Sequence, residues 1–141
     1  MQDQPYPRVK PTYGAKAQYA TDAYPSPLLT PAQKKFFQEV TGTFLYYARA
    51  IDATMLLALG TIATQQSATT ENTMHKVHQF LDYAATHPNA IITYRASNII
   101  LAAHSDASYL SESKARSKAG GYFFMYDDSA IAPNNGSVLT I

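Results

Sequence analysis

The sequence predicts an α+β fold in which helices come first along the chain and strands follow. Between residues 30 and 88, apolar side chains recur every three or four positions, which is the spacing of amphipathic helices. Between residues 89 and 141, β-branched and aromatic residues gather in short runs that are typical of strands. Residues 1–29 show neither pattern and hold five of the eight prolines. We therefore divide the chain into a Pro/Tyr-rich linker or arm (1–29), a helical segment (30–88) and a strand segment (89–141).

The N-terminal segment is rich in tyrosine as well as proline. Tyr6, Tyr13, Tyr19 and Tyr24 are scattered along it without the period of a helix or a strand. Because an extended segment of this kind cannot build a core of its own, we expect these rings to pack against a surface supplied by a neighbour.

Three helices are predicted in the next segment, each with a start signal. Thr30 is a suitable N-cap, and Pro31 suits the first helical position because its missing N–H needs no partner there. Asp52 can cap a second helix, and Thr70 can cap a third. We expect the third helix to stop at His87, because a proline follows it. Three helices joined by short polar turns can bury one shared apolar seam.

Four strands are predicted after residue 89. They are expected at "IITYRAS", "NIILAAHSD", "GGYFFMYDD" and "GSVLTI". The second is expected to end at Asp106, and a loop rich in Ser, Lys and Arg should join it to the third. Asn135-Gly136 favours a turn with positive φ before the fourth. Four strands without a covering layer are marginally stable in water, so the sheet is expected to be truncated.

Composition narrows the class of protein. The 141 residues are 46% apolar and carry a net charge of +1, so any attraction for nucleic acid must come from local clusters of Lys and Arg. The chain has no cysteine, which excludes disulfides and thiolate metal sites. It contains neither a run of about 18 apolar residues nor a signal-peptide pattern. We expect an intracellular protein, cytoplasmic or nuclear, that is not secreted and has no membrane partner.

Two stretches resemble a known family. "QEVTGTFLYYARAIDATMLLALGTIATQ" is similar to the segment that follows the reverse-transcriptase palm in the polymerase polyprotein of copia-type long-terminal-repeat retrotransposons. "HSDASYLSESKARSKAGGYFFM" resembles the first hairpin of the ribonuclease H domain of the same polyprotein. The resemblance implies a thumb or connection-like helical unit, followed by the first strands of a ribonuclease H-like mixed sheet.

The resemblance also implies a role for Asp106. In this family the first strand ends at an acid that ligates two catalytic metal ions, and Asp106 stands at the matching position. The parent enzyme copies RNA into DNA and degrades the RNA strand of the hybrid with Mg²⁺. Two-metal cleavage of a phosphodiester needs several carboxylates, and the family's other acids lie beyond this chain. We therefore expect no hydrolysis by this chain itself and no tightly bound metal.

Six cations are candidate contacts for a template-primer or an RNA–DNA hybrid, the partners that the family implies beside the rest of the polyprotein. Three lie in the first helix and three alternate across the expected hairpin loop; they are Lys34, Lys35, Arg49, Lys114, Arg116 and Lys118. Cations so placed can meet phosphates and make binding depend on salt. Ordinary solvated charges explain them as well.

Simpler interpretations exist for the acids and for the whole chain. Without the resemblance, an Asp before Ala-Ser is most often a turn residue that bonds its own backbone. Asp127 and Asp128 are also interpreted as solvated turn acids. The alternative function is a non-catalytic structural module that binds nucleic acid or protein.

Overall fold

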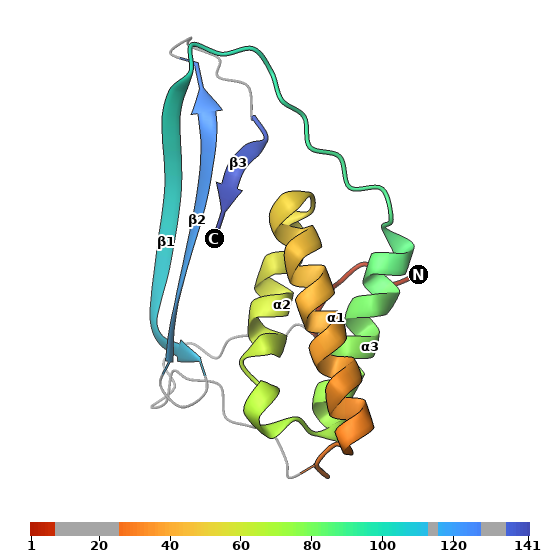
Figure 1. Ribbon diagram of the computed structural model, residues 1–141. Coiled ribbons are helices and arrows are strands. Elements are labelled where there is room, and N and C mark those ends of the chain that lie inside the picture. Colours follow the sequence, from red (N-terminus) through yellow and green to blue (C-terminus); the bar gives the residue numbers. More distant parts are fainter. Residues whose placement is uncertain (8–25, 113–115, 128–134) are drawn as a thin grey trace. The chain divides into compact units, whose positions relative to one another are not determined.

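The computed structural model describes residues 1–7, 26–112, 116–127 and 135–141. They form two compact units, one helical (1–7 and 26–90) and one built around a sheet (residues from 91 onward). The described residues contain three α-helices and a three-stranded antiparallel sheet (Figure 1), so the predicted α+β class is confirmed. Two short 3-10 turns, η1 (Ala53–Met55) and η2 (Gln66–Ala68), flank the second helix.

Helix α1 (Pro31–Ala50) begins where its capping residues predict. The backbone N–H of Gln33 donates to Thr30 Oγ1 at 3.4 Å, and the N–H of Thr30 donates to Gln33 Oε1 at 2.9 Å. This reciprocal capping box provides partners for backbone groups that would otherwise have none.

Helix α3 (Glu71–Thr86) also follows its predicted cap, whereas α2 (Leu56–Ala63) begins after the 3-10 turn η1, and it is this turn that Asp52 caps. Asp52 Oδ1 accepts from the N–H of Thr54 at 3.1 Å, which starts the turn leading into α2. Thr70 and Thr73 form a second capping box at the start of α3, and α3 ends at His87 as expected. Local sequence signals therefore placed all three helices.

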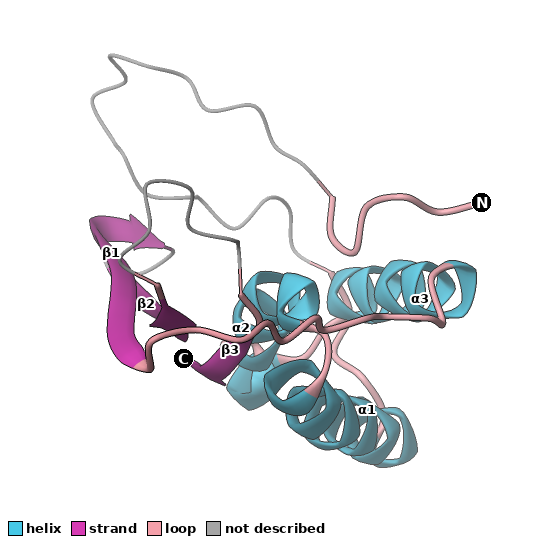
Figure 2. Cartoon of the chain, turned by 90° about the horizontal axis from the view of Figure 1, so that it is seen from above, coloured by secondary structure: helices cyan, strands magenta, loops and turns pink. Residues whose placement is uncertain are grey.

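The three helices share one core (Figure 2). Its buried apolar side chains are Phe37, Ala48, Met55, Ala58, Leu59, Ile62, Met74, Val77 and Phe80. Phe80 has no exposed surface and meets Phe44 edge-to-face, with ring centroids 5.1 Å apart. The apolar stripes of the helices thus pack together as their periodicity predicts.

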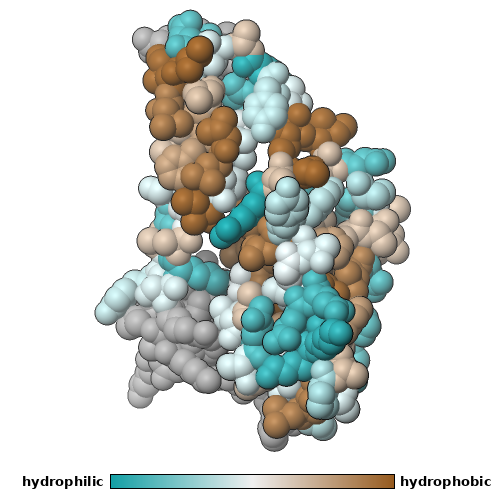
Figure 3. Space-filling view, in the orientation of Figure 1, coloured by the Kyte–Doolittle hydropathy of each residue, from teal (hydrophilic) through white to brown (hydrophobic). Residues whose placement is uncertain are grey.

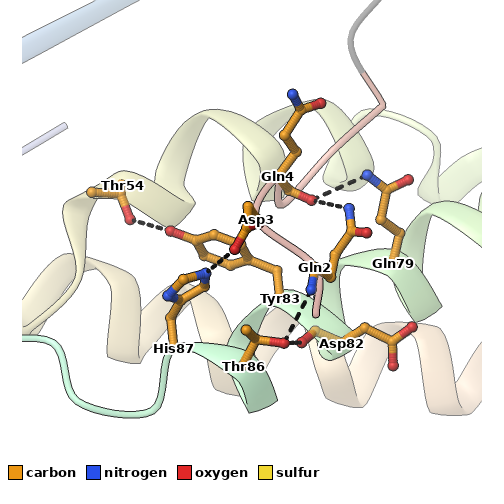
Figure 4. Close-up of polar contacts among 9 residues, drawn as sticks. All are labelled: Gln2, Asp3, Gln4, Thr54, Gln79, Asp82, Tyr83, Thr86 and His87. Atoms are coloured by element: carbon orange, nitrogen blue, oxygen red, sulfur yellow. Dashed lines mark hydrogen bonds and ion pairs between the residues drawn. The ribbon is translucent and has the colours of Figure 1, made fainter.

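The first seven residues lie against α3 (Figure 4). The N–H of Gln2 donates to Thr86 Oγ1 at 3.3 Å, and Asp3 Oδ1 is 3.3 Å from Nε2 of His87. Tyr6 packs against the helical core, so its neighbour is the chain itself. Tyr13, Tyr19 and Tyr24 lie outside the described residues.

The sheet has the order β1-β2-β3, with every pair antiparallel. Its strands are β1 (Ile100–Glu112), β2 (Arg116–Tyr126) and β3 (Ser137–Thr140). Asp106 lies opposite Gly120, and the ladder continues to Ser108 opposite Lys118. The prediction that the strand ends at Asp106 is therefore wrong. Cross-strand pairing extends β1 through a segment whose Ser residues had indicated a loop.

The predicted strand "IITYRAS" is also wrong, because residues 91–97 form no strand. Side-chain bonds hold this segment in place of a ladder. Asn135 Oδ1 accepts from the N–H of Arg95 at 2.8 Å, and its Nδ2 donates to the carbonyls of Arg95 at 3.1 Å and Met125 at 2.9 Å. The amide side chain of Asn135, 4% exposed, thus connects this segment to β2.

The positive φ predicted at Asn135-Gly136 is not observed at either residue. Close packing is what requires a glycine at position 136. A Cβ at Gly136 would lie 2.3 Å from Cγ2 of Ile92, closer than any real contact. Among described non-glycine residues the left-handed conformation occurs at Ile99, whose φ is 59°. A β-branched residue is strained there.

Candidate functional site

Asp106 lies in the middle of β1 and is exposed. Its Oδ1 accepts from the N–H of the next residue, Ala107, at 2.9 Å. Across the ladder stands Gly120, which has no side chain to cover the carboxylate. Asp106 thus bonds to nearby backbone, as a turn residue would. It nevertheless lies within a strand, on an open part of the sheet.

Residues that face each other in an antiparallel ladder share one side of the sheet. The Asp106 face therefore contains Ala102, His104, Asp106 and Ser108 from β1, and Lys118, Gly120, Tyr122 and Phe124 from β2. The His104 ring stacks on Phe124, with centroids 5.2 Å apart and an interplanar angle of 16°. Tyr122 donates from its hydroxyl to the carbonyl of Asn135 at 2.6 Å. One acid, one imidazole and one ammonium group are therefore placed on an aromatic surface.

Within the sheet unit, the other described acids occupy backbone positions far from Asp106 along the strands. At about 3.3 Å per strand residue, Glu112 is about 20 Å further along β1. By the same spacing, Asp127 lies about 23 Å from Gly120, the residue opposite Asp106. Asp127 instead accepts from Nδ2 of Asn98 at 2.7 Å, and Asp128 lies outside the described residues.

Two-metal chemistry requires carboxylates that hold both ions at once. Within the described part of the chain, no three His, Asp or Glu side chains are grouped so that they could hold a metal ion. The residues described around Asp106 therefore do not fit a pair of Mg²⁺ ions. No step of metal-assisted hydrolysis can be derived from this site.

The hairpin cations do not share one loop, which corrects the prediction. Arg116 and Lys118 belong to β2, where Lys118 pairs with Ser108, one pair beyond Ala107. Lys118 is half-buried at the sheet surface and makes an interaction of its own. Lys114 lies outside the described residues. Arg116 and Lys118 lie in a strand and not in a loop because the pairing of β1 with β2 extends well past the expected strand end.

The helical cations lie at opposite ends of α1. Lys34 is half-buried and Lys35 is exposed, where its Nζ is 3.8 Å from Glu39 Oε1. Arg49 is in the last turn, where a cation complements the helix dipole. Helical geometry separates Lys35 from Arg49 by about 21 Å. They cannot form one cluster, although each can meet a different phosphate.

Sequence analysis missed the aromatic side of this face. Tyr122, Phe124 and Tyr126 alternate along β2, with successive ring centroids 5.4 and 6.4 Å apart. Their period of two was readable in "YFFMY" and predicts one shared face. Which β1 residues join them depends on the register, which a single strand cannot reveal.

Comparisons with protein-family models, with curated proteins and with solved structures gave no significant match. The resemblance to retrotransposon polyproteins therefore remains a prediction from the quoted motifs. Among the helices that the structure describes, none has both the length and the apolar character needed to cross a membrane.

Proposed function

We propose that this chain is a segment of a retroelement reverse transcriptase and ribonuclease H polyprotein. In this proposal it contributes to binding an RNA–DNA hybrid and does not hydrolyse the hybrid by itself. The parent copies RNA into DNA and degrades the RNA strand with Mg²⁺. The proposal rests first on the motif around Asp106, "HSDASYLSESKARSKAGGYFFM".

One structural observation supports the non-catalytic part of the proposal. Asp106 is exposed on an antiparallel hairpin, and Lys118 stands two pairs along the same face. Among the described residues, no group of three His, Asp or Glu side chains could hold a metal ion. Lys118 is the cation on this face that could contact a phosphate, whereas one carboxylate does not suit two-metal cleavage.

Hybrid binding can be tested by its dependence on salt. Each protein cation that contacts a phosphate contributes about −0.9 to the slope of log K against log salt concentration. We expect Lys118→Gln to weaken binding of an RNA–DNA hybrid and to reduce the slope by about 1. Lys76→Gln is the matched control, because Lys76 lies over the Tyr6 ring and belongs to none of the proposed contacts. Equal slopes for the two variants would contradict a role for Lys118.

Hydrolysis is tested separately. The purified chain is incubated with a labelled hybrid and Mg²⁺ or Mn²⁺, beside Asp106→Asn. We expect no cleavage by either protein, and tighter hybrid binding by the variant, because it removes a charge that repels phosphate. Cleavage that Asp106→Asn abolishes would overturn the non-catalytic assignment.

A second candidate is a protein-binding module, favoured by apolar side chains on the opposite face of the sheet. Leu101, Leu139 and Ile141 are 63%, 51% and 62% exposed, and brown apolar surface is visible over the strands in Figure 3. Exposed apolar patches often mark protein contacts. Failure of the chain to bind hybrids at low salt would favour this candidate.

A further inference from the structure

The outer edge of β1 is unpaired within the described residues, because β1 is the first strand in the order β1-β2-β3. Two hydrogen bonds show which backbone groups point outward. Gly121 exchanges bonds with Ile141 on the β3 side, so the N–H groups of even-numbered β2 residues face β1. The N–H of Ala107 bonds to the Asp106 side chain. Odd-numbered β1 residues therefore present their N–H and C=O groups at the outer edge.

The side chains along this edge are complementary to those of a second, identical β1 edge that runs antiparallel to the first. If a second β1 runs antiparallel with Ser105 opposite Ser105, then His104 faces Asp106 and Leu101 faces Tyr109. Each of these pairs occurs twice because of the two-fold symmetry. The odd-numbered residues meet as hydrogen-bonded pairs, which is what the outward backbone groups require.

We propose that two copies of this chain associate through their β1 edges in this register and form a continuous six-stranded sheet. In this pairing a hydrogen-bond donor, His104, faces an acceptor, Asp106, and the side chains of Leu101 and Tyr109 face each other. The ring nitrogens of His104 can donate to the Asp106 carboxylate of the other copy. Leu101, 63% exposed, and Tyr109, 83% exposed, cover each other on the opposite face.

The association changes the partner of Asp106. In the single chain its carboxylate bonds to the N–H of Ala107, which blocks one outward group of the edge. In the dimer that N–H pairs with the carbonyl of Ala103 in the second copy, and the carboxylate turns to His104. This inference goes beyond the proposed hybrid binding and does not depend on it.

The register can be tested with single cysteines, because the chain has none of its own. In Ser105→Cys the two thiols lie opposite each other, with Cα atoms about 5.5 Å apart, within reach of a disulfide. In Ala107→Cys, on the same face, the two Cα atoms lie about 14 Å apart, from an offset of four residues along the strand and the spacing between the strands. We expect mild oxidation to give a covalent dimer at least tenfold faster for Ser105→Cys. Equal rates would overturn the proposed register.

Charge exchange supplies a test that does not depend on disulfide geometry. His104→Asp places two acids opposite each other, and Asp106→Lys places a lysine opposite a histidine. We expect each variant to raise the dimer dissociation constant about tenfold, because His104→Asp sets carboxylates against each other in two cross-strand pairs and Asp106→Lys removes the acceptor of His104 from both pairs. The double variant His104→Asp with Asp106→Lys restores opposite charges and should restore the dimer. Sedimentation equilibrium measures all four proteins, with circular dichroism as the folding control.

A wild-type chain that remains monomeric at millimolar concentration would overturn the proposal. So would a double variant as weakly associated as the single ones.

Discussion

Different interactions stabilise the helical unit and the sheet unit. Of the ten buried apolar side chains among the described residues, nine lie in the helical unit and one, Phe124, lies in the sheet unit. The sheet unit depends on its backbone ladders and on the hydrogen bonds of the buried Asn135. Apolar burial is the larger source of stability in proteins, so we expect the helical unit to be the more stable of the two.

The two units also differ in the surfaces that they offer to a partner. The helical unit has a closed core, although single apolar side chains such as Leu28, Tyr46 and Leu57 are exposed on it. The sheet unit has exposed apolar residues, an exposed acid and, within the part of the chain that the structure describes, an unpaired β1 edge, so both proposals concern its strands. Burial of such surface by a partner would add the stability that the unit lacks.

The largest expected effect comes from the helical core. Phe80→Ala removes a ring with no exposed surface and leaves a cavity beside Phe44. We expect the helical unit to lose about 3–5 kcal/mol of stability. Urea unfolding followed by circular dichroism at 222 nm measures this loss. Tyr46→Ala, at a site 79% exposed on α1, is the control and should change little. Similar losses for both would mean that the helices do not share this core.

In the sheet unit the largest expected effect comes from a polar side chain. Asn135→Ala leaves the N–H of Arg95 and the carbonyl of Met125 without the partners described above. Fully buried groups left unpaired cost about 1–3 kcal/mol each, and these part-buried groups should cost up to that amount. We expect faster hydrogen exchange of amides in residues 91–95 and in β2, and unchanged exchange in α3. Asn98→Ala, which removes one exposed bond to Asp127, is the control. Protection lost equally in α3 would contradict the division into two separately stabilised units.

The smallest expected effect is a gain in stability, whereas the previous two are losses. Ile99→Gly relieves the strain of a β-branched residue at φ 59° and should stabilise the sheet unit by about 1 kcal/mol. Ile91→Gly is matched, because Ile91 is 85% exposed and lacks a positive φ. That variant should destabilise, since glycine adds freedom to the unfolded chain. Thermal melting of the amide signal of Gly121 reports on both. A loss of stability in Ile99→Gly would contradict the strain.

Local signals predicted the helices well and the sheet in part. Thr30 and Thr70 capped the helices as expected because a capping box forms among residues close in sequence. Strands depend on distant partners, and two predictions were wrong for that reason. The β-branched residues 91–97 form no strand. β1 continues past Asp106 because its residues pair with β2 as far as Arg116.

In the candidate site too, the residues were predicted from the sequence but their arrangement depended on distant partners. Asp106 and Lys118 were identified from the motif, and their separation in sequence suggested a strand end and a loop. The register placed them two pairs apart on one face, with His104 and Phe124 beside them. Asn135 was expected to make a turn, and its role as a bridge depends on groups 10 and 40 residues away.

The sequence by itself determined the α+β class, the three helices with the caps of α1 and α3, and the alternation that gives each strand two distinct faces. These features follow from interactions between residues a few positions apart. Only the tertiary structure decided the length of β1, the partner of each strand residue and the distance of Asp106 from other acids. Those outcomes depend on pairing between segments far apart in the chain, where a shift of one residue moves every side chain to the other face.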